Sequence, residues 1–272
     1  SKGSEVLFKI KITYTGPARR AGEALMVFDH LDAANKGRRA WQYLPGQRRV
    51  KLAPDVSFDT PNVGTAGAST YDDTYVFNGS MERFDWKLLG RQEIFIPYHN
   101  YRLDDPNVSY DELLTKYHIN PDYMRYELKR VWVAEATLKP GQRHIYAKRR
   151  LYIDEDTGLT TITENYDGRG ELWKVALTTN FYEYGGEAYD RRVEMYHDLR
   201  AGAYIAECLN NDSAKIELVR LITPISDTPK RVRMGAFKER GFSSMIPASL
   251  GSKLSTISSG PSQIRWIHRI CA

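Results

Sequence analysis

The chain has 272 residues and a formal net charge of +5, and its 39 basic residues are interspersed with 34 acidic ones. Charge therefore gives no reason to predict nucleic-acid binding, and the length allows one large β domain or two ordinary domains. Two cysteines, Cys208 and Cys271, lack metal-ligand spacing, which argues against a zinc site or a disulfide framework and leaves one disulfide open. No apolar run reaches the roughly 18–20 residues of a membrane-spanning helix.

The first fifth of the chain predicts β-strands. Residues 5–15 alternate between apolar and polar side chains, as a half-buried strand does, and Gly16-Pro17 ends the run. Three further strands are predicted over residues 22–32, 39–44 and 48–52. Residues 55–73 are rich in Pro, Gly, Thr and Asp and have no period, which predicts a long loop of functional or mobile character.

A mixed segment follows. Residues 75–89 predict a short helix and then a strand, and residues 92–98 and 128–138 predict two more strands. Residues 109–117 predict a short helix, because Ser109 is a suitable N-cap and acidic residues occupy the first turn.

An antiparallel meander is predicted from His144 to Leu177, where strand-length runs are separated by Asp/Gly clusters at residues 154–158 and 167–170. The first cluster lacks the ligand spacing of a calcium loop, and a strand rather than a helix follows the second. Both are therefore predicted to be turns and not metal or phosphate sites. Residues 187–204 then predict a hairpin that turns at residues 200–202, with a helix over residues 187–199 as the alternative.

About ten or eleven strands make a sheet large enough to curl on itself, so the fold class is mainly β with short helices (α+β). We expect one domain over residues 1–225. Residues 226–272 form an atypical basic tail that includes a Ser/Gly-rich stretch, and we expect this tail to be poorly ordered.

No catalytic set is visible in the sequence. The six histidines form no HxH, HExxH or helical pair, no GxSxG motif occurs, and Cys208 has no activating neighbour. We therefore predict no catalytic residue, no metal and no cofactor.

Basic pairs recur along the chain. Interleaved with aromatic residues, they suit single-stranded nucleic acid or anionic lipid headgroups. Charge on the outward face of a strand also discourages edge pairing without any ligand, and we favour this structural explanation for most of them. Three are singled out as rim residues that contact a headgroup or a membrane partner: Arg48, Arg49 and Arg149.

Aromatic and aliphatic residues form a further group. On the strand that begins near Glu171, alternate residues from Trp173 to Phe181 share one face. Two explanations stay open: a dry core covered by a helix, or a concave sheet whose inner face holds an apolar ligand. The candidate ligand-binding residues are Trp41, Tyr43, Trp86, Trp173, Val175, Leu177 and Phe181.

Several longer strings resemble known families. The run from Trp41 to Lys51 resembles the W-x-Y-L-P-x-x-x-R-V hairpin of outer-membrane lipoprotein-sorting-like proteins. Over roughly residues 5–210 the chain resembles the family called domain of unknown function 1329. The matching strings are FNGS at 77–80, DWKLLG at 85–90, RVWVAEATLK at 130–139, RHIYAKR at 143–149, DED at 154–156 and YDGRGELW at 166–173.

The resemblance implies a LolA/LolB-like fold, which is a curved, mostly antiparallel sheet forming an incomplete β-barrel with short helices and loops as plug or lid. It implies export to the periplasm or to the periplasmic face of the outer membrane, and carriage of a lipid or other hydrophobic molecule without chemistry. Members of the family usually begin with a signal peptide and a further N-terminal portion. This chain starts at Ser1, so we expect it to be N-terminally truncated.

Three functions are weighed. A non-enzymatic carrier would bury acyl chains on the concave face, with residues 55–73 and the helix at 109–117 as lid and the rim arginines steering headgroups. An envelope scaffold or adaptor with a dry core would instead bind a protein partner, such as an envelope transporter or an outer-membrane protein. A hydrolase acting on envelope lipids is the weakest, because no nucleophile–base pair is visible. We expect no nucleic-acid partner.

Overall fold

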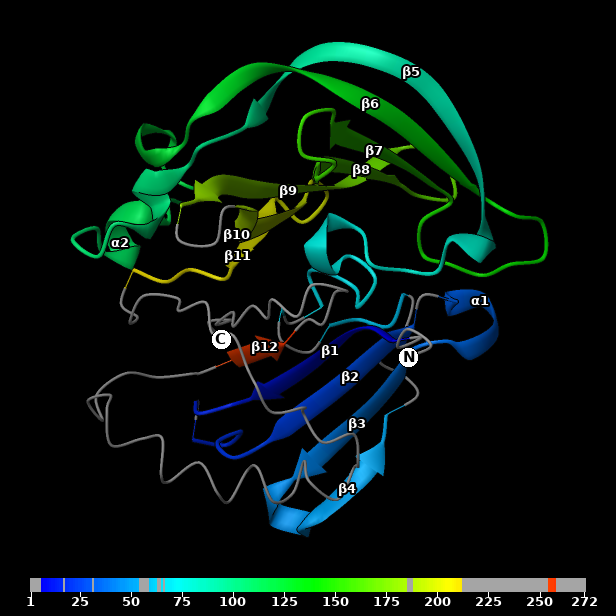
Figure 1. Cartoon of the computed structure of the whole chain (residues 1–272), viewed down its shortest axis with the longest axis vertical. Coiled ribbons are helices and arrows are strands. Elements are labelled where there is room, and N and C mark those ends of the chain that lie inside the picture. Colours follow the sequence, from blue (N-terminus) through cyan, green and yellow to red (C-terminus); the bar gives the residue numbers. More distant parts are fainter. Residues whose placement is uncertain are drawn as a thin grey trace. The chain divides into compact units, whose positions relative to one another are not determined.

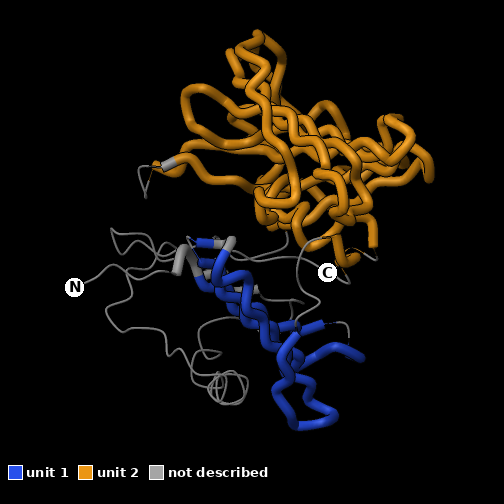
Figure 2. Tube along the Cα trace, turned by 90° about the vertical axis from the view of Figure 1, so that its right-hand side faces the viewer, with its two compact units in different colours: residues 1–56, 212–272 blue, residues 57–211 orange. Residues whose placement is uncertain are grey.

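The computed structural model describes residues 6–16, 18–30, 32–53, 59–62, 65, 67–184, 188–211 and 254–257. Within these residues the fold is mainly β, with antiparallel strands in two open sheets and only short helices (Figure 1). No helix of this part of the chain is long and apolar enough to cross a membrane. Two compact units are present: unit 1 is Ser1–Val56 with Asp212–Ala272, and unit 2 is Ser57–Asn211 (Figure 2).

Unit 1 contains a five-stranded sheet in the order β12-β1-β2-β3-β4. Its strands are β1 (Val6–Thr13), β2 (Ala24–His30), β3 (Arg39–Leu44), β4 (Arg49–Leu52) and β12 (Leu254–Ile257). The helices α1 (Ala33–Lys36) and η1 (Pro45–Gln47) flank β3. One face of β2 and β3 builds a core cluster of Ala24, Met26, Phe28 and Tyr43.

The four predicted N-terminal strands are confirmed. Most of the predicted tail lies outside the described residues; within it, β12 pairs with β1. Residues 1–225 include parts of both compact units. That they form one domain stays a prediction.

Unit 2 contains a seven-stranded sheet in the order β11-β10-β9-β8-β7-β6-β5. Its strands are β5 (Phe84–Pro97), β6 (Tyr126–Leu138), β7 (Lys148–Asp154), β8 (Thr160–Tyr166), β9 (Leu172–Glu183), β10 (Ala188–Asp198) and β11 (Ala203–Glu207). Its short helices are η3 (Thr74–Val76), η4 (Met81–Arg83), η5 (Tyr101–Asp104), α2 (Tyr110–Leu113) and η6 (Pro121–Tyr123).

The predicted meander is confirmed as β7, β8 and β9, with both Asp/Gly clusters as turns. The Asp154 carboxylate accepts from the backbone N–H of Thr157 at 3.1 Å, and the Asp167 carboxylate accepts from the backbone N–H of Glu171 at 2.9 Å. These aspartates thus cap their own turns, as short polar side chains commonly do. β10 and β11 confirm the predicted hairpin, and the alternative helix over residues 187–199 is wrong.

Two other elements differ from expectation. Residues 84–97 form one 14-residue strand, where we predicted two separate strands; the short helix predicted before them corresponds to the 3-10 helices η3 and η4. A bulge lies between Leu88 and Gly90, and Gly90 has a φ of 112°, which glycine adopts without strain. The pairing with β6 continues on both sides of this bulge. α2 is shorter than predicted, but Ser109 is its N-cap and accepts from the Glu112 N–H at 3.2 Å.

The seven-stranded sheet curls strongly. In Figure 1, β5 and β6 arch over β7, β8 and β9. The Asn100 N–H, just after β5, donates to the Asn180 carbonyl of β9 at 3.0 Å, and the Tyr101 hydroxyl donates to the Tyr182 carbonyl at 3.0 Å. β5 and β9 therefore meet at one end although three strands separate them in the sheet. The predicted curved, open, antiparallel sheet is confirmed in unit 2.

Candidate functional site

The two faces of the seven-stranded sheet carry very different side chains. Residues that are directly opposite on neighbouring antiparallel strands point to the same face, so the pairing register assigns each residue. Arg149 and Arg150 are adjacent in β7 and therefore lie on opposite faces. We call the face with Arg149 the covered face, because residues 67–83 (the cover segment) pack against it. The face with Arg150 is called the row face.

An unbroken apolar row crosses the row face. Val133, Tyr152, Ile162, Leu177 and Met195 are opposite one another in successive pairs from β6 to β10. The end members are buried, with 1% and 3% exposure, but the three central ones are partly exposed. Tyr152 and Ile162 pack in part against a buried cluster, and the surface that the three residues leave exposed is apolar.

One end of this apolar row is closed. Ile96, Tyr98, Val131 and Val133 form a buried cluster against which Tyr152 and other partly buried residues pack. The Tyr98 hydroxyl donates to the Asp154 carboxylate at 3.3 Å. Burial is the main cause that raises the pKa of Tyr98, so this hydroxyl stays protonated and its hydrogen bond persists.

A second row, made of charged residues, runs beside the apolar row, two residues away along each strand. Glu135, Arg150 and Glu164 are opposite one another on β6, β7 and β8, and we call them the charged row. Arg150 lies 2.8 Å from a Glu135 oxygen and 3.8 Å from a Glu164 oxygen. The hydrogen bond from Arg150 lowers the pKa of Glu135, which therefore stays ionised at neutral pH. The Tyr166 hydroxyl donates to Glu164 at 2.7 Å, and the Lys148 ammonium lies 4.0 Å over the Tyr166 ring.

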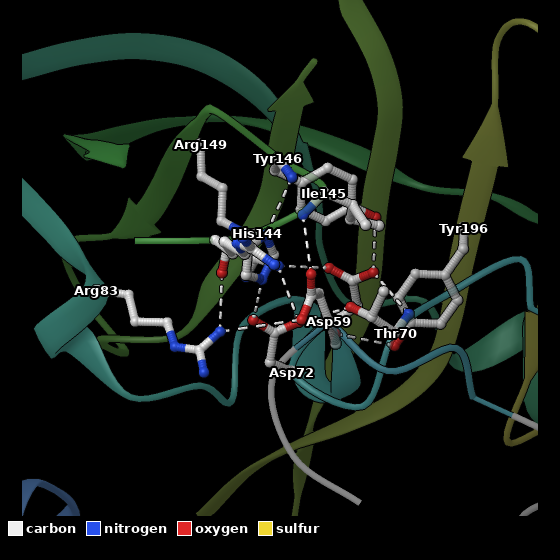
Figure 3. A network of polar contacts seen from close by, with 11 residues as sticks. Asp59, Thr70, Asp72, Arg83, His144, Ile145, Tyr146, Arg149 and Tyr196 are labelled. Carbon is white, nitrogen blue, oxygen red and sulfur yellow. Dashed lines mark hydrogen bonds and ion pairs between the residues drawn. The ribbon is translucent and has the colours of Figure 1, made fainter. Parts of the chain in front are cut away.

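The covered face holds a buried ionic network (Figure 3). The Arg149 side chain is fully buried, and its Nη2 donates to Asp72 Oδ1 at 3.0 Å and to Asp73 Oδ1 at 3.1 Å. The Tyr146 hydroxyl donates to Asp73 Oδ2 at 2.9 Å, and His144 Nε2 lies 2.9 Å from Asp72 Oδ2. Two consecutive carboxylates of the cover segment are thus paired with groups on and just before β7.

The hydrogen bonds of His144 indicate which of its ring nitrogens carries the proton. Its Nδ1 accepts from the backbone N–H of Tyr146 at 3.0 Å, so Nε2 carries the proton and donates to Asp72. Burial disfavours the charged form of Asp72, but Arg149 and His144 outweigh burial and hold the Asp72 pKa below its ordinary value. For Asp73 burial dominates and raises the pKa, opposed by Arg149 and reinforced by Asp72.

Further contacts hold the cover segment to β9 and β10. The Lys174 ammonium donates to the Ala68 carbonyl at 2.8 Å, and the Tyr75 N–H donates to Glu194 Oε2 at 2.9 Å. Val76 packs in a buried cluster with Ala176 and Tyr196. The end of the predicted lid loop at 55–73 is therefore buried and ion-paired in this structure, and its movement stays a prediction.

The structure brings only part of the predicted ligand-binding group together. Val175 and Leu177 lie on the row face, with Val175 opposite Glu164. Trp173 lies at a bulge in the pairing with β8 and does not join the row face. Its indole N–H donates to Asp198 at 3.2 Å, and its ring lies 5.9 Å from Tyr146 of the network. Phe181 is buried and packs at 5.1 Å on Tyr101, past a second bulge in the β9–β10 pairing.

The remaining predicted aromatic residues have structural partners elsewhere. The Trp86 indole N–H donates to the Met81 carbonyl at 2.9 Å, and its ring lies 5.3 Å from Phe77 of the cover segment. Tyr43 is buried in the core of unit 1, and Trp41 packs against that same cluster. Ligand contact by all seven residues stays a prediction.

The predicted rim arginines separate into two groups. Arg48 and Arg49 are exposed at the start of β4, and their contact with a headgroup stays a prediction. Arg149 is not a rim residue: its side chain has 0% exposure and is neutralised by Asp72 and Asp73. Because a strand alternates its side chains, the neighbouring Arg150 takes the partly exposed position instead. The alternation of residues 148–152 predicts that the two arginines lie on opposite faces, but it does not say which of these faces is buried.

Within the described part of the chain, no group of three or more His, Cys, Asp or Glu residues is placed to hold a metal ion. The structure thus offers two features for function: the apolar row with its bordering charged row, and the ionic network that fixes the cover segment.

Sequence comparison identifies the family. The sequence model of "Protein of unknown function (DUF1329)" matches residues 1–228. The chain belongs to the DUF1329 family. This DUF1329 chain is 46% identical over 217 residues to "Uncharacterized protein PA3922" of Pseudomonas aeruginosa PAO1, a match that covers 78% of this chain and 47% of the relative. The chain thus spans about half the length of the curated relative that it matches.

Three solved structures show partial likeness to the DUF1329 chain. A DUF1329 family protein from Desulfovibrio piger has a TM-score of 0.48 and 16% identity, over 73% of this chain and 68% of that one. A putative outer membrane lipoprotein-sorting protein domain from Vibrio parahaemolyticus has a TM-score of 0.47 and 15% identity, over 74% and 80%. The LolA superfamily protein NE2245 from Nitrosomonas europaea has a TM-score of 0.43 and 13% identity, over 75% and 84%.

Proposed function

We propose that this DUF1329 chain is part of a non-enzymatic envelope protein that binds a lipid or another hydrophobic molecule on the row face. The apolar row carries the proposal, because Tyr152, Ile162 and Leu177 stay partly exposed on central strands of the sheet. Covering apolar surface contributes about 25 cal/mol per Å². An acyl chain laid along this row would therefore gain affinity from burial alone.

The contacts of His144 give it a structural role in the buried network. Both of its ring nitrogens are engaged, one with Asp72 and one with the Tyr146 N–H, and its side chain has 0% exposure. A general base needs a free nitrogen within reach of its substrate, which this histidine does not offer. The strings that resemble outer-membrane lipoprotein-sorting-like proteins support a place in the periplasm or at the periplasmic face of the outer membrane.

The test measures binding of a fluorescent fatty acid to the purified chain, together with native mass spectrometry for co-purifying lipid. Leu177→Asp places a charge in the apolar row and is expected to weaken probe binding at least about tenfold, which is about 1.4 kcal/mol. Leu128→Asp is the matched control, since Leu128 is 56% exposed on the opposite face of β6. It should change binding less than about twofold. Far-UV circular dichroism confirms that both variants fold.

Absence of probe binding by the unsubstituted chain, with no lipid in its mass spectrum, would refute the proposal. Equal weakening by both variants would also contradict it, because binding would then not depend on the apolar row.

One observation favours a second candidate function, that of an adaptor for a protein partner such as an envelope transporter or an outer-membrane protein. Phe95 and Leu128 are directly opposite each other on β5 and β6, and they are 65% and 56% exposed. An exposed apolar pair formed by the edge strand β5 and its neighbour β6 suits a protein contact. Capture of a defined envelope protein that is lost in Phe95→Ser, while the fatty probe still binds, would support this role.

A further inference from the structure

The charged row lies beside the apolar row, where the head group of a bound amphiphile would contact it. We propose that the row face selects an amphiphile with a zwitterionic head, meaning one head that carries both a cationic and an anionic group. This inference rests on the proposed function, because it assigns the head of a ligand whose tail covers the apolar row.

The geometry places the head on one side of the apolar row. The opposite side of the row, towards Val131, is closed by the buried cluster that contains Ile96 and Tyr98. Along β7, Tyr152, Arg150 and Lys148 follow one another on the row face. At about 3.3 Å per residue, Arg150 lies about 7 Å and Lys148 about 13 Å along the strand from Tyr152. Both therefore lie beside a tail that runs along the apolar row, and a head that bends to this side meets them.

The charges on this side compensate one another. Arg150, Lys148 and Lys87, which is opposite Glu135, are positive, and Glu135, Glu164 and Asp85, which is opposite Thr137, are negative. The side chains of the charged row are 21–30% exposed, so they are accessible and yet partly shielded from water. A head of a single sign would be attracted by the residues of one sign and repelled by those of the other. A zwitterionic head can place its cation beside Glu164 and its anion beside Lys148.

The arginine on the other face does not change this balance. Arg149 is fully buried and its charge is compensated by Asp72 and Asp73. Arg149 therefore does not contact a head on the row face, where the charged row and Lys148 are the charged groups of β7 and β8 beside the apolar row.

The experiment compares four amphiphiles of one chain length, each below its critical micelle concentration. They are dodecylphosphocholine, dodecyl sulfate, dodecyltrimethylammonium and dodecyl maltoside, and each competes with the fluorescent fatty probe for the full chain. Dodecylphosphocholine is expected to bind at least about fivefold more tightly than the sulfate or the trimethylammonium. The maltoside, with no charge, reports the contribution of the tail.

Two substitutions test the assignment of charges. Glu164→Gln is expected to shift the preference towards dodecyl sulfate by about threefold, and Lys148→Gln to shift it towards dodecyltrimethylammonium by about as much. Lys116→Gln is a matched control, because Lys116 also lies over a tyrosine ring, at 4.9 Å from the centre of Tyr117, but belongs to the loop after α2. Glu93→Gln is the control for Glu164, since Glu93 is exposed on β5 and opposite Arg130.

The outcomes separate the two proposals. If all four amphiphiles bind within about twofold of one another, the inference on the head is overturned and the proposed function stands. A preference for either singly charged head in the unsubstituted chain would also overturn it. If none of the four binds, the proposed function fails and the inference fails with it.

Discussion

Arg149 and Arg150 are neighbours in β7, and the two faces of the sheet give them opposite environments. The Arg149 side chain has 0% exposure and is bound to Asp72 and Asp73, whereas the Arg150 side chain is 30% exposed between Glu135 and Glu164. Each arginine has two carboxylate partners, so the number of partners does not distinguish them. Burial does, because removing one partner of a buried pair leaves a charge that water cannot solvate.

The largest effect is expected from removing the buried arginine. Arg149→Met leaves the carboxylates of the cover segment without their cation, so we expect it to destabilise the chain by about 3–5 kcal/mol. Arg150→Met, the matched substitution one residue away, should cost at most about 1 kcal/mol, because its partners can be hydrated. Urea unfolding followed by tryptophan fluorescence measures both.

Losses of equal size in these two variants would contradict the contrast between the faces. A further variant tests its cause: adding Asp72→Asn and Asp73→Asn to Arg149→Met removes all the buried charges of the network and should restore part of the stability. If the triple variant is less stable than Arg149→Met alone, uncompensated charge is not the reason for the loss.

A second effect concerns pH and also belongs to the covered face. Burial, reinforced by Glu194 directly opposite on β10, raises the pKa of Glu207 from 4.5 to about 8. The unfolded chain releases this proton first, so stability falls as pH rises from about 4.5 to about 8 and is level above that window. One pKa unit corresponds to about 1.36 kcal/mol. Glu207→Gln is therefore expected to be more stable than the unsubstituted chain by a few kcal/mol at about pH 9.

Melting temperatures recorded from about pH 4 to about pH 9 check this expectation, and the difference between the two proteins should vanish at the acid end. Glu93→Gln serves as the exposed control and should follow the unsubstituted chain throughout. A Glu207→Gln curve that runs parallel to the unsubstituted one at every pH would show that Glu207 does not titrate in this window.

The smallest effect concerns a single hydroxyl. Thr163 on the covered face is fully buried, and its Oγ1 has no hydrogen-bond partner among the described residues. Thr163→Val keeps the shape and removes this unsatisfied group, so we expect a gain of up to about 1 kcal/mol in the free energy of unfolding. Thr161→Val is the control, because the Thr161 hydroxyl donates to the Tyr152 carbonyl at 3.4 Å and its removal brings no such gain. A lower urea midpoint for Thr163→Val would indicate that the hydroxyl is hydrated or bonded.

Much of the fold was predictable from local pattern. The meander of β7, β8 and β9, its two aspartate turns and the Ser109 N-cap are all short-range features, and the structure confirms them. The prediction of two strands in place of β5 was wrong, and Gly90 lies at the predicted break. Pairing with β6 on both sides of the bulge is what keeps it one element.

The candidate site was predictable only in part, for a related reason. Val175 and Leu177 share the row face as their spacing predicts, but a bulge in the pairing of β9 with β8 separates Trp173 from them. A bulge depends on two strands, and a single strand's alternation cannot reveal it. The charged row was missed because its members come from three strands and become neighbours only through register.

The alternation of residues 148–152 already places Arg149 and Arg150 on opposite faces of a strand, because each extended residue reverses the direction of its side chain. Which of the two faces is buried cannot follow from that pattern. Asp72 and Asp73, the residues that pair with Arg149, precede it by 77 and 76 positions. Local periodicity is encoded within a few residues, whereas the docking of the cover segment depends on contacts between distant parts of the chain, and these exist only once the sheet has formed.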